Sequence, residues 1–94
     1  HQASPRVKPL APEQVLAAAD EFCAARGVHV RSFAALTACA AVPGARIHGV
    51  PVCGSPREGA SLLFDATVRL EPLSEHNHTF AAVLRDTYLR WCEA

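Results

Sequence analysis

Aromatic residues, long apolar runs and net charge are all scarce in this sequence of 94 residues. Phe, Tyr and Trp make up 6% of a chain that is 50% hydrophobic, so we expect a thin core between closely packed helices. No apolar run approaches the roughly 20 residues that span a bilayer, and the first residues lack a signal pattern, which predicts a soluble chain without membrane contact. Nine basic and nine acidic side chains cancel. This balance argues against binding to nucleic acid.

The length fits one small domain. Residues 1–10 contain Pro5 and Pro9 and show no apolar periodicity, which predicts an extended lead-in. Residues 11–94 carry helical periodicity, and we find no internal repeat, charge block or low-complexity tract in them. We therefore predict an all-α domain over 11–94.

Local start and stop signals predict four helices. Proline suits a first helical position, serine caps a helix N-terminus, and glycine ends a helix in the left-handed conformation. Ser55-Pro56-Arg57-Glu58 combines such signals in a reciprocal capping box, while Pro72 ends the helix that it opens. The predicted helices cover 12–26, 33–42, 56–70 and the segment from Phe80 to Trp91.

The third and fourth helices are expected to form a hairpin, with the polar connection 71–78 at its tip. The apolar spacing of the third helix predicts that Leu62, Leu63, Ala66 and Leu70 face inward. Between the second and third helices, the valines and glycines of 46–53 predict a short extended segment, which Pro51 restricts to an edge.

Four cysteines, Cys23, Cys39, Cys53 and Cys92, leave two interpretations open. The first two lie among apolar residues at helical spacing, which favours reduced thiols in a core. An even number of cysteines also permits disulfides in an exported protein, and Asn77-His78-Thr79 matches the acceptor pattern for N-glycosylation. A small secreted, disulfide-linked protein is therefore one hypothesis.

The connection 71–78 concentrates carboxylates, imidazoles and an amide immediately before a helix N-terminus. Unpaired N–H groups at such an end can hold the phosphates of a nucleotide, with a carboxylate nearby to carry magnesium. Polar residues at a hairpin tip are also ordinary, and Ser74 or Asn77 can simply cap the fourth helix. A zinc site built from His76, His78 and either His48 or a cysteine is disfavoured, because residues two apart in a helical turn face away from each other.

The order of these parts resembles the Fic/Doc family. Its signature, His-x-Phe-x-(Asp/Glu)-(Ala/Gly)-Asn-(Lys/Gly)-Arg, lies between two helices of an all-helical fold that a short β-hairpin flap precedes. The corresponding stretch here is Glu71-Pro72-Leu73-Ser74-Glu75-His76-Asn77-His78-Thr79, and Gly49-Val50-Pro51-Val52 would be the flap. The resemblance covers roughly residues 11–93 and implies a small Fic/Doc-like helical domain.

The resemblance also implies roles for individual residues. Glu75 falls on the acidic residue that helps to hold magnesium, and Asn77 falls on the asparagine of the phosphate-binding turn. His78 and Thr79 continue the nucleotide-binding stretch, although Thr79 replaces the phosphate-binding arginine. Glu71 replaces the catalytic histidine and becomes, with Asn77, the catalytic candidate. The residues expected to dock a target chain by β-addition are Gly49, Val50 and Val52.

The function implied by the family is that of a cytoplasmic toxin component of a bacterial toxin–antitoxin pair. Such a protein transfers phosphate or AMP from ATP, with Mg²⁺, to a hydroxyl of a target protein, and an antitoxin protein holds it. Because Glu71 and Thr79 replace the histidine and the arginine, the second hypothesis is a catalytically inactive Fic-fold module that binds protein. The secreted, disulfide-linked protein is the third.

Overall fold

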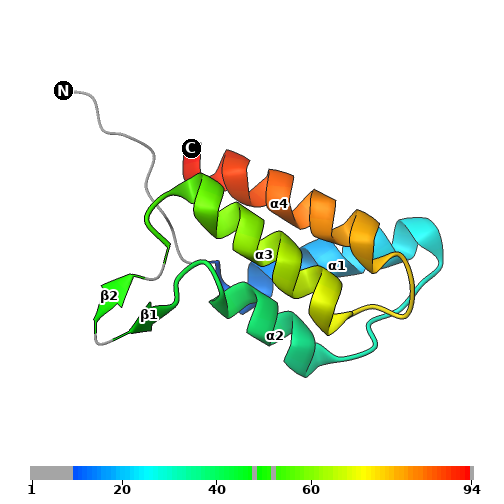
Figure 1. Cartoon of the computed structure of the whole chain (residues 1–94). Helices are drawn as coiled ribbons and strands as arrows, with labels where there is room; N and C mark the ends of the chain where they lie inside the picture. Colours follow the sequence, from blue (N-terminus) through cyan, green and yellow to red (C-terminus); the bar gives the residue numbers. More distant parts are fainter. Residues whose placement is uncertain (1–9, 48, 52, 94) are drawn as a thin grey trace.

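The structure is a computed structural model, and it describes residues 10–47, 49–51 and 53–93. In these residues the chain is helical apart from one short β-hairpin (Figure 1). The elements are α1 (Pro12–Arg26), α2 (Phe33–Ala41), β1 (Arg46–Ile47), β2 (Val50–Pro51), α3 (Pro56–Leu70) and α4 (Asn77–Glu93). The predicted all-α class is confirmed. Of the predicted lead-in 1–10, the structure describes Leu10 alone, which is buried.

The first two helices begin and end at the residues that local chemistry predicts. Ser32 caps α2, because its Oγ accepts a hydrogen bond from the N–H of Ala35 at 3.1 Å. Gly27 ends α1 with a φ of 69°, a left-handed conformation that costs glycine little. The predicted bounds of α1 are confirmed, while α2 ends one residue before the predicted 42.

The predicted capping box at α3 forms in a modified way. Ser55 Oγ accepts the N–H of Glu58 at 3.2 Å, as predicted. The carboxylate of Glu58 does not return this bond to Ser55 but accepts the N–H of Gly54 at 2.5 Å. The side chain therefore ties α3 to the segment that leaves the hairpin. The helix itself covers the predicted residues 56–70.

Helices α3 and α4 lie side by side as the predicted hairpin, and α1 and α2 pack against them (Figure 1). Gly59 allows a close approach of the two helices, since a Cβ atom there would lie 3.3 Å from the Tyr88 ring and hydroxyl. None of the helices in the described part of the chain has the length and apolar character needed to cross a bilayer.

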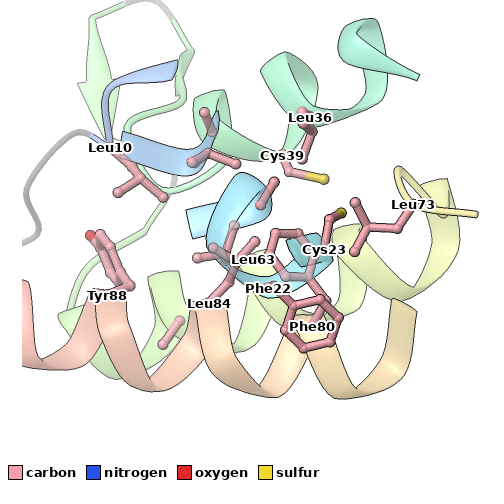
Figure 2. Packing of buried hydrophobic residues seen from close by; sticks show 14 of the residues in the cluster. Leu10, Phe22, Cys23, Leu36, Cys39, Leu63, Leu73, Phe80, Leu84 and Tyr88 are labelled. Atoms are coloured by element: carbon pink, nitrogen blue, oxygen red, sulfur yellow. The ribbon is translucent and has the colours of Figure 1, made fainter. Parts of the chain in front are cut away.

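The core lies between the α3–α4 hairpin and the other two helices (Figure 2). Phe22 of α1 and Phe80 of α4 meet with their ring centroids 5.2 Å apart, a tilted arrangement that aromatic pairs favour. Leu63 of α3 lies beside Phe22, and Leu36 of α2 lies next to Cys39 in the same buried cluster. Leu73, from the connection between α3 and α4, is also fully buried, so this connection is part of the core.

The buried face of α3 differs from the predicted one. Leu62 and Leu70 are each 37% exposed, whereas Leu63 and Thr67 are fully buried. The Thr67 hydroxyl donates to the carbonyl of Leu63 at 2.7 Å, so burying it leaves no unpaired polar group. The prediction that Leu62 and Leu70 face inward was therefore wrong. The buried residues of this helix are Gly59, Ala60, Leu63 and Thr67.

The hairpin occupies the predicted extended segment. Its strands pair antiparallel, with Arg46 opposite Pro51 and Ile47 opposite Val50, and Gly49 turns the chain with a φ of 80°. Val52, the third predicted flap residue, lies outside the described residues. Figure 1 shows the hairpin at the end of α3 that lies away from the α3–α4 connection.

Candidate functional site

The connection between α3 and α4 has a defined and partly strained backbone. Glu71 ends α3 in the left-handed conformation, with a φ of 49° and a ψ of 65°. His76, immediately before α4, has a φ of 61°. Non-glycine residues adopt this region at a cost, so the surrounding contacts must hold both positions. The connection is a shaped turn in which Leu73 is the buried anchor.

The backbone of this connection pairs with the linker between α1 and α2. Leu73 and Val30 form an isolated antiparallel bridge. The Pro72 carbonyl accepts from the N–H of Arg31 at 2.7 Å, and the N–H of Ser74 donates to the His29 carbonyl at 2.8 Å. The Ser74 hydroxyl accepts in turn from the N–H of His29 at 3.1 Å. Two linkers distant in sequence thus form one junction, in place of a simple solvated turn.

The Asn77 side chain binds the backbone of the turn. Its Oδ1 accepts the N–H of Leu73 at 2.8 Å, and its Nδ2 donates to the Leu73 carbonyl at 3.0 Å. Both polar atoms of the amide therefore bind the backbone of one residue, Leu73. Asn77 does not cap α4, and neither does Ser74, whose hydroxyl lies on His29.

The N-terminus of α4 presents donors that the described part of the chain leaves unused. The first bond of this end runs from the N–H of Phe80 to the carbonyl of His76, at 2.9 Å. The preceding N–H groups, those of Asn77, His78 and Thr79, meet no acceptor in residues 10–47, 49–51 and 53–93. Such donors, together with the positive end of the helix dipole, attract anions.

The two acidic candidates expose their side chains, and an arginine binds the backbone carbonyl of one of them. Glu71 and Glu75 are both exposed, so their carboxylates are in contact with solvent. The carbonyls of Leu70 and Glu71 accept from the Arg31 guanidinium at 2.8 and 2.7 Å, which places a cation at the C-terminus of α3. Arg31 is the cation that the structure brings to this connection.

His78 and Thr79 lie in the first turn of α4 and are both exposed. The His78 ring stands edge-on against Phe64 of α3, with centroids 5.1 Å apart. The Arg85 guanidinium lies 5.0 Å from the centroid of the Phe64 ring. His78 is therefore held on the outer side of the α3–α4 hairpin.

Metal binding by the protein alone has no support in the structure. In residues 10–47, 49–51 and 53–93, no group of three or more His, Cys, Asp or Glu side chains is placed to hold an ion. His48, the distant ligand of the zinc alternative, lies outside the described residues. A carboxylate such as Glu75 would need oxygen atoms from a bound ligand to complete the shell of a magnesium ion.

The structure does not bring the flap residues to the turn. Gly49 and Val50 lie in the hairpin before α3, and Val50 is 64% exposed. The turn follows α3, a helix of 15 residues. At about 1.5 Å per residue, about 22 Å of helix separates the two sites. A target chain paired with the hairpin would therefore be distant from the N-terminus of α4 (Figure 1).

Sequence reasoning missed Arg31 and Ser74 as residues that shape the turn. Both act across more than 30 positions of sequence, so no local pattern marks them. The only sequence feature that could have pointed to them is that an arginine and a serine stand in linkers with little apolar periodicity. That signal shows polar residues but not their partners.

The four cysteines are free and buried. Burial raises the pKa of the Cys23, Cys39 and Cys53 thiols, because the interior disfavours the thiolate. Asp20 beside Cys23 and Glu58 beside Cys53 raise those pKa values further through charge repulsion. The thiols thus behave as core residues and lack the conditions that activate a nucleophile.

No family model, no curated protein and no solved structure matches this chain closely enough to show a relationship.

Proposed function

We propose that this chain is a Fic/Doc-like component of a bacterial toxin–antitoxin system that acts in the cytoplasm and binds a nucleotide at the turn before α4. The observation that carries the proposal is the unused set of N–H donors of Asn77, His78 and Thr79 at the start of a 17-residue helix. Helix N-termini of this kind bind phosphate groups, and the family that the chain resembles binds the phosphates of ATP at this turn. An antitoxin and a target protein would be its partners.

Two features of the turn support the resemblance at the level of backbone shape. Leu73 is fully buried and takes the position of the aromatic residue in the signature. His76 has a left-handed φ of 61°, and it takes the position where the signature has alanine or glycine. Glycine adopts that conformation at little cost, so the same bend fits the glycine form of the signature.

Each candidate residue has one role in this proposal. Asn77 holds the turn in shape, while the N–H groups of His78 and Thr79 receive phosphate oxygens. Glu75 supplies one carboxylate to Mg²⁺, whose remaining ligands are phosphate oxygens and water, so no preformed metal cluster is required. Glu71 is the base that would accept the proton of a target hydroxyl as that oxygen attacks phosphorus and the nucleotide's leaving group departs.

Calorimetry with Mg–ATP tests the binding step. Native protein should bind Mg–ATP and gain thermal stability at saturating nucleotide. Glu75→Gln should weaken binding when Mg²⁺ is present and have little effect when EDTA removes it. Glu93→Gln, at an exposed position at the far end of α4, is the matched control. Absence of both heat and a melting shift would refute nucleotide binding at this turn.

Label transfer tests the chemistry. Bacterial lysate proteins would be incubated with native protein and ATP labelled at the α or the γ phosphate. Transfer of the α label indicates AMP transfer, and transfer of the γ label indicates phosphorylation. Glu71→Gln should abolish either signal. A signal that Glu71→Gln leaves intact would contradict the role of Glu71.

The second candidate function is a catalytically inactive module of the same fold that works by protein contact. It is favoured by the distance of about 22 Å along α3 between the hairpin and the turn. Thr79 also brings no charge to the phosphate site. The double variant Glu71→His/Thr79→Arg should then transfer label in the lysate assay while native protein does not. Transfer by native protein would exclude this alternative.

A further inference from the structure

An apolar hollow lies between α1 and α2, separate from the turn at α4. It has a volume of about 220 Å³, and its lining residues are Pro12, Glu13, Leu16, Phe33, Leu36 and Thr37. Phe33 is 64% exposed and Leu16 is 37% exposed, whereas Leu36 at the base is 3% exposed. An aromatic ring this exposed beside an apolar hollow is typical of a contact surface, because water covers it at a cost in free energy.

The size and walls of the hollow limit what can occupy it. Pockets for small ligands hold about 300–1,000 Å³, so a hollow of about 220 Å³ is better suited to one or two protruding side chains. Every lining residue belongs to α1 or α2, and two helices offer no strand edge that an extended peptide could join. An extended peptide would find few backbone partners there. A helix brings its own backbone bonds and inserts apolar side chains alone.

The charged side chains beside the hollow limit which residues a bound partner can place around its apolar stripe. Glu13 lines the hollow, and Asp20 lies two turns further along the same side of α1, next to Leu16 in helical spacing. Both carboxylates are exposed, and no lysine or arginine lines the hollow. Helix α2 carries no charged residue at all. A partner helix would therefore meet an apolar strip with acidic groups along one border.

We propose that the α1–α2 hollow is a docking site for an amphipathic helix of a partner protein whose apolar stripe is flanked by lysine or arginine. Its apolar side chains pack against Phe33 and Leu16, and its basic side chains pair with Glu13 and Asp20. The proposal does not depend on nucleotide binding. It predicts a contact surface that stays intact when the turn before α4 is altered.

A display library of helical peptides tests the chemistry of the occupant. Each peptide carries a fixed apolar stripe at i, i+3, i+4 and i+7, and the flanking positions vary among Lys, Glu, Gln and Ser. Selection on native protein should enrich lysine at the flanks. Selection on Glu13→Lys/Asp20→Lys should enrich glutamate instead. Phe33→Ser should weaken the selected lysine peptides by at least about tenfold, because it removes the exposed wall of the hollow.

Controls separate this surface from other exposed apolar residues and from self-association. Val83→Ser removes an apolar side chain that is 38% exposed on α4, and it should leave peptide affinity unchanged. Melting curves verify that each variant is folded. Equal enrichment of acidic and basic flanks, or equal loss with Val83→Ser, would overturn the proposal. So would sedimentation showing that native protein self-associates and Phe33→Ser does not, because the occupant would then be a second copy.

Discussion

At the scale of the residue, Asn77 shows how a structural side chain can occupy the position of a functional one. Its amide makes two hydrogen bonds to the backbone of Leu73, one to the N–H at 2.8 Å and one to the carbonyl at 3.0 Å. Leu73 is fully buried, so the bonds fix a core residue as well as the turn. In the proposed function Asn77 acts on the phosphates through the shape of the turn, and its own amide is not free to bind them.

The Asn77→Ala substitution should therefore lower the free energy of unfolding by about 2 kcal/mol, since it removes both bonds and leaves a buried N–H group unpaired. Urea unfolding followed by circular dichroism measures this change. Thr79→Ala, at an exposed position two residues later, should change stability by no more than about 0.5 kcal/mol. Equal effects of the two substitutions would contradict the structural role.

At the scale of the element, the two linkers at one end of the molecule stabilise each other. Arg31 contributes most directly, because its guanidinium binds the carbonyls of Leu70 and Glu71 at the C-terminus of α3. Its own N–H also binds the Pro72 carbonyl at 2.7 Å. One residue of the α1–α2 linker thus terminates α3 and starts the turn.

We expect Arg31→Ala to lower the free energy of unfolding by about 1 kcal/mol, the typical net value for hydrogen bonds from an exposed side chain. Arg31→Lys should restore part of the loss, because an ammonium keeps the charge but not the paired geometry. Arg69→Ala, in the last turn of α3, is the control for a general charge effect. Amide hydrogen exchange should report faster opening of residues 70–74 in Arg31→Ala. Unchanged exchange there would refute the capping role.

The elements themselves were largely predictable, and their partners were not. Ser32, Gly27 and Ser55 mark helix ends by local geometry, so the bounds of α1 and α3 followed from the sequence. The bond from Ser74 to His29 joins residues 45 apart, which no local signal contains. Thr67 was missed for a related reason, since its burial depends on a bond to Leu63 that periodicity does not register.

At the scale of the whole molecule, the candidate sites are dispersed. The hairpin and the turn lie at opposite ends of α3 (Figure 1). The apolar hollow lies between α1 and α2. From the sequence, Gly49 was expected to dock the target chain and Glu75 to hold magnesium, but order along the chain does not fix the distance between them. A target that used both hairpin and turn would have to extend along the whole of α3, whereas a partner in the hollow need not touch either.

The buried thiols link the core to the stability of the whole molecule. Burial raises the pKa of Cys23, Cys39 and Cys53 above the 9.0 of a free thiol. Unfolding exposes these groups, which then lose their protons at lower pH than they do in the folded state. Their contribution to the free energy of unfolding is therefore fully present below about pH 8. It is lost as the pH rises past the pKa of the thiols in the unfolded chain.

Urea unfolding between pH 7 and 9.5 in reductant should show stability falling above about pH 8.5, by at most about 1.4 kcal/mol per pH unit for each thiol. Cys39→Ser keeps nearly the same side-chain size and does not titrate in this range, so its curve should fall less steeply. Stability that stays constant to pH 9.5, or a slope that Cys39→Ser leaves unchanged, would show that the buried thiols do not control the pH dependence of stability.

The redox state of the thiols is a separate prediction. The intact mass of native protein should be the same before and after reduction, because the four cysteines are free. A mass increase on reduction would establish disulfides and support a secreted protein.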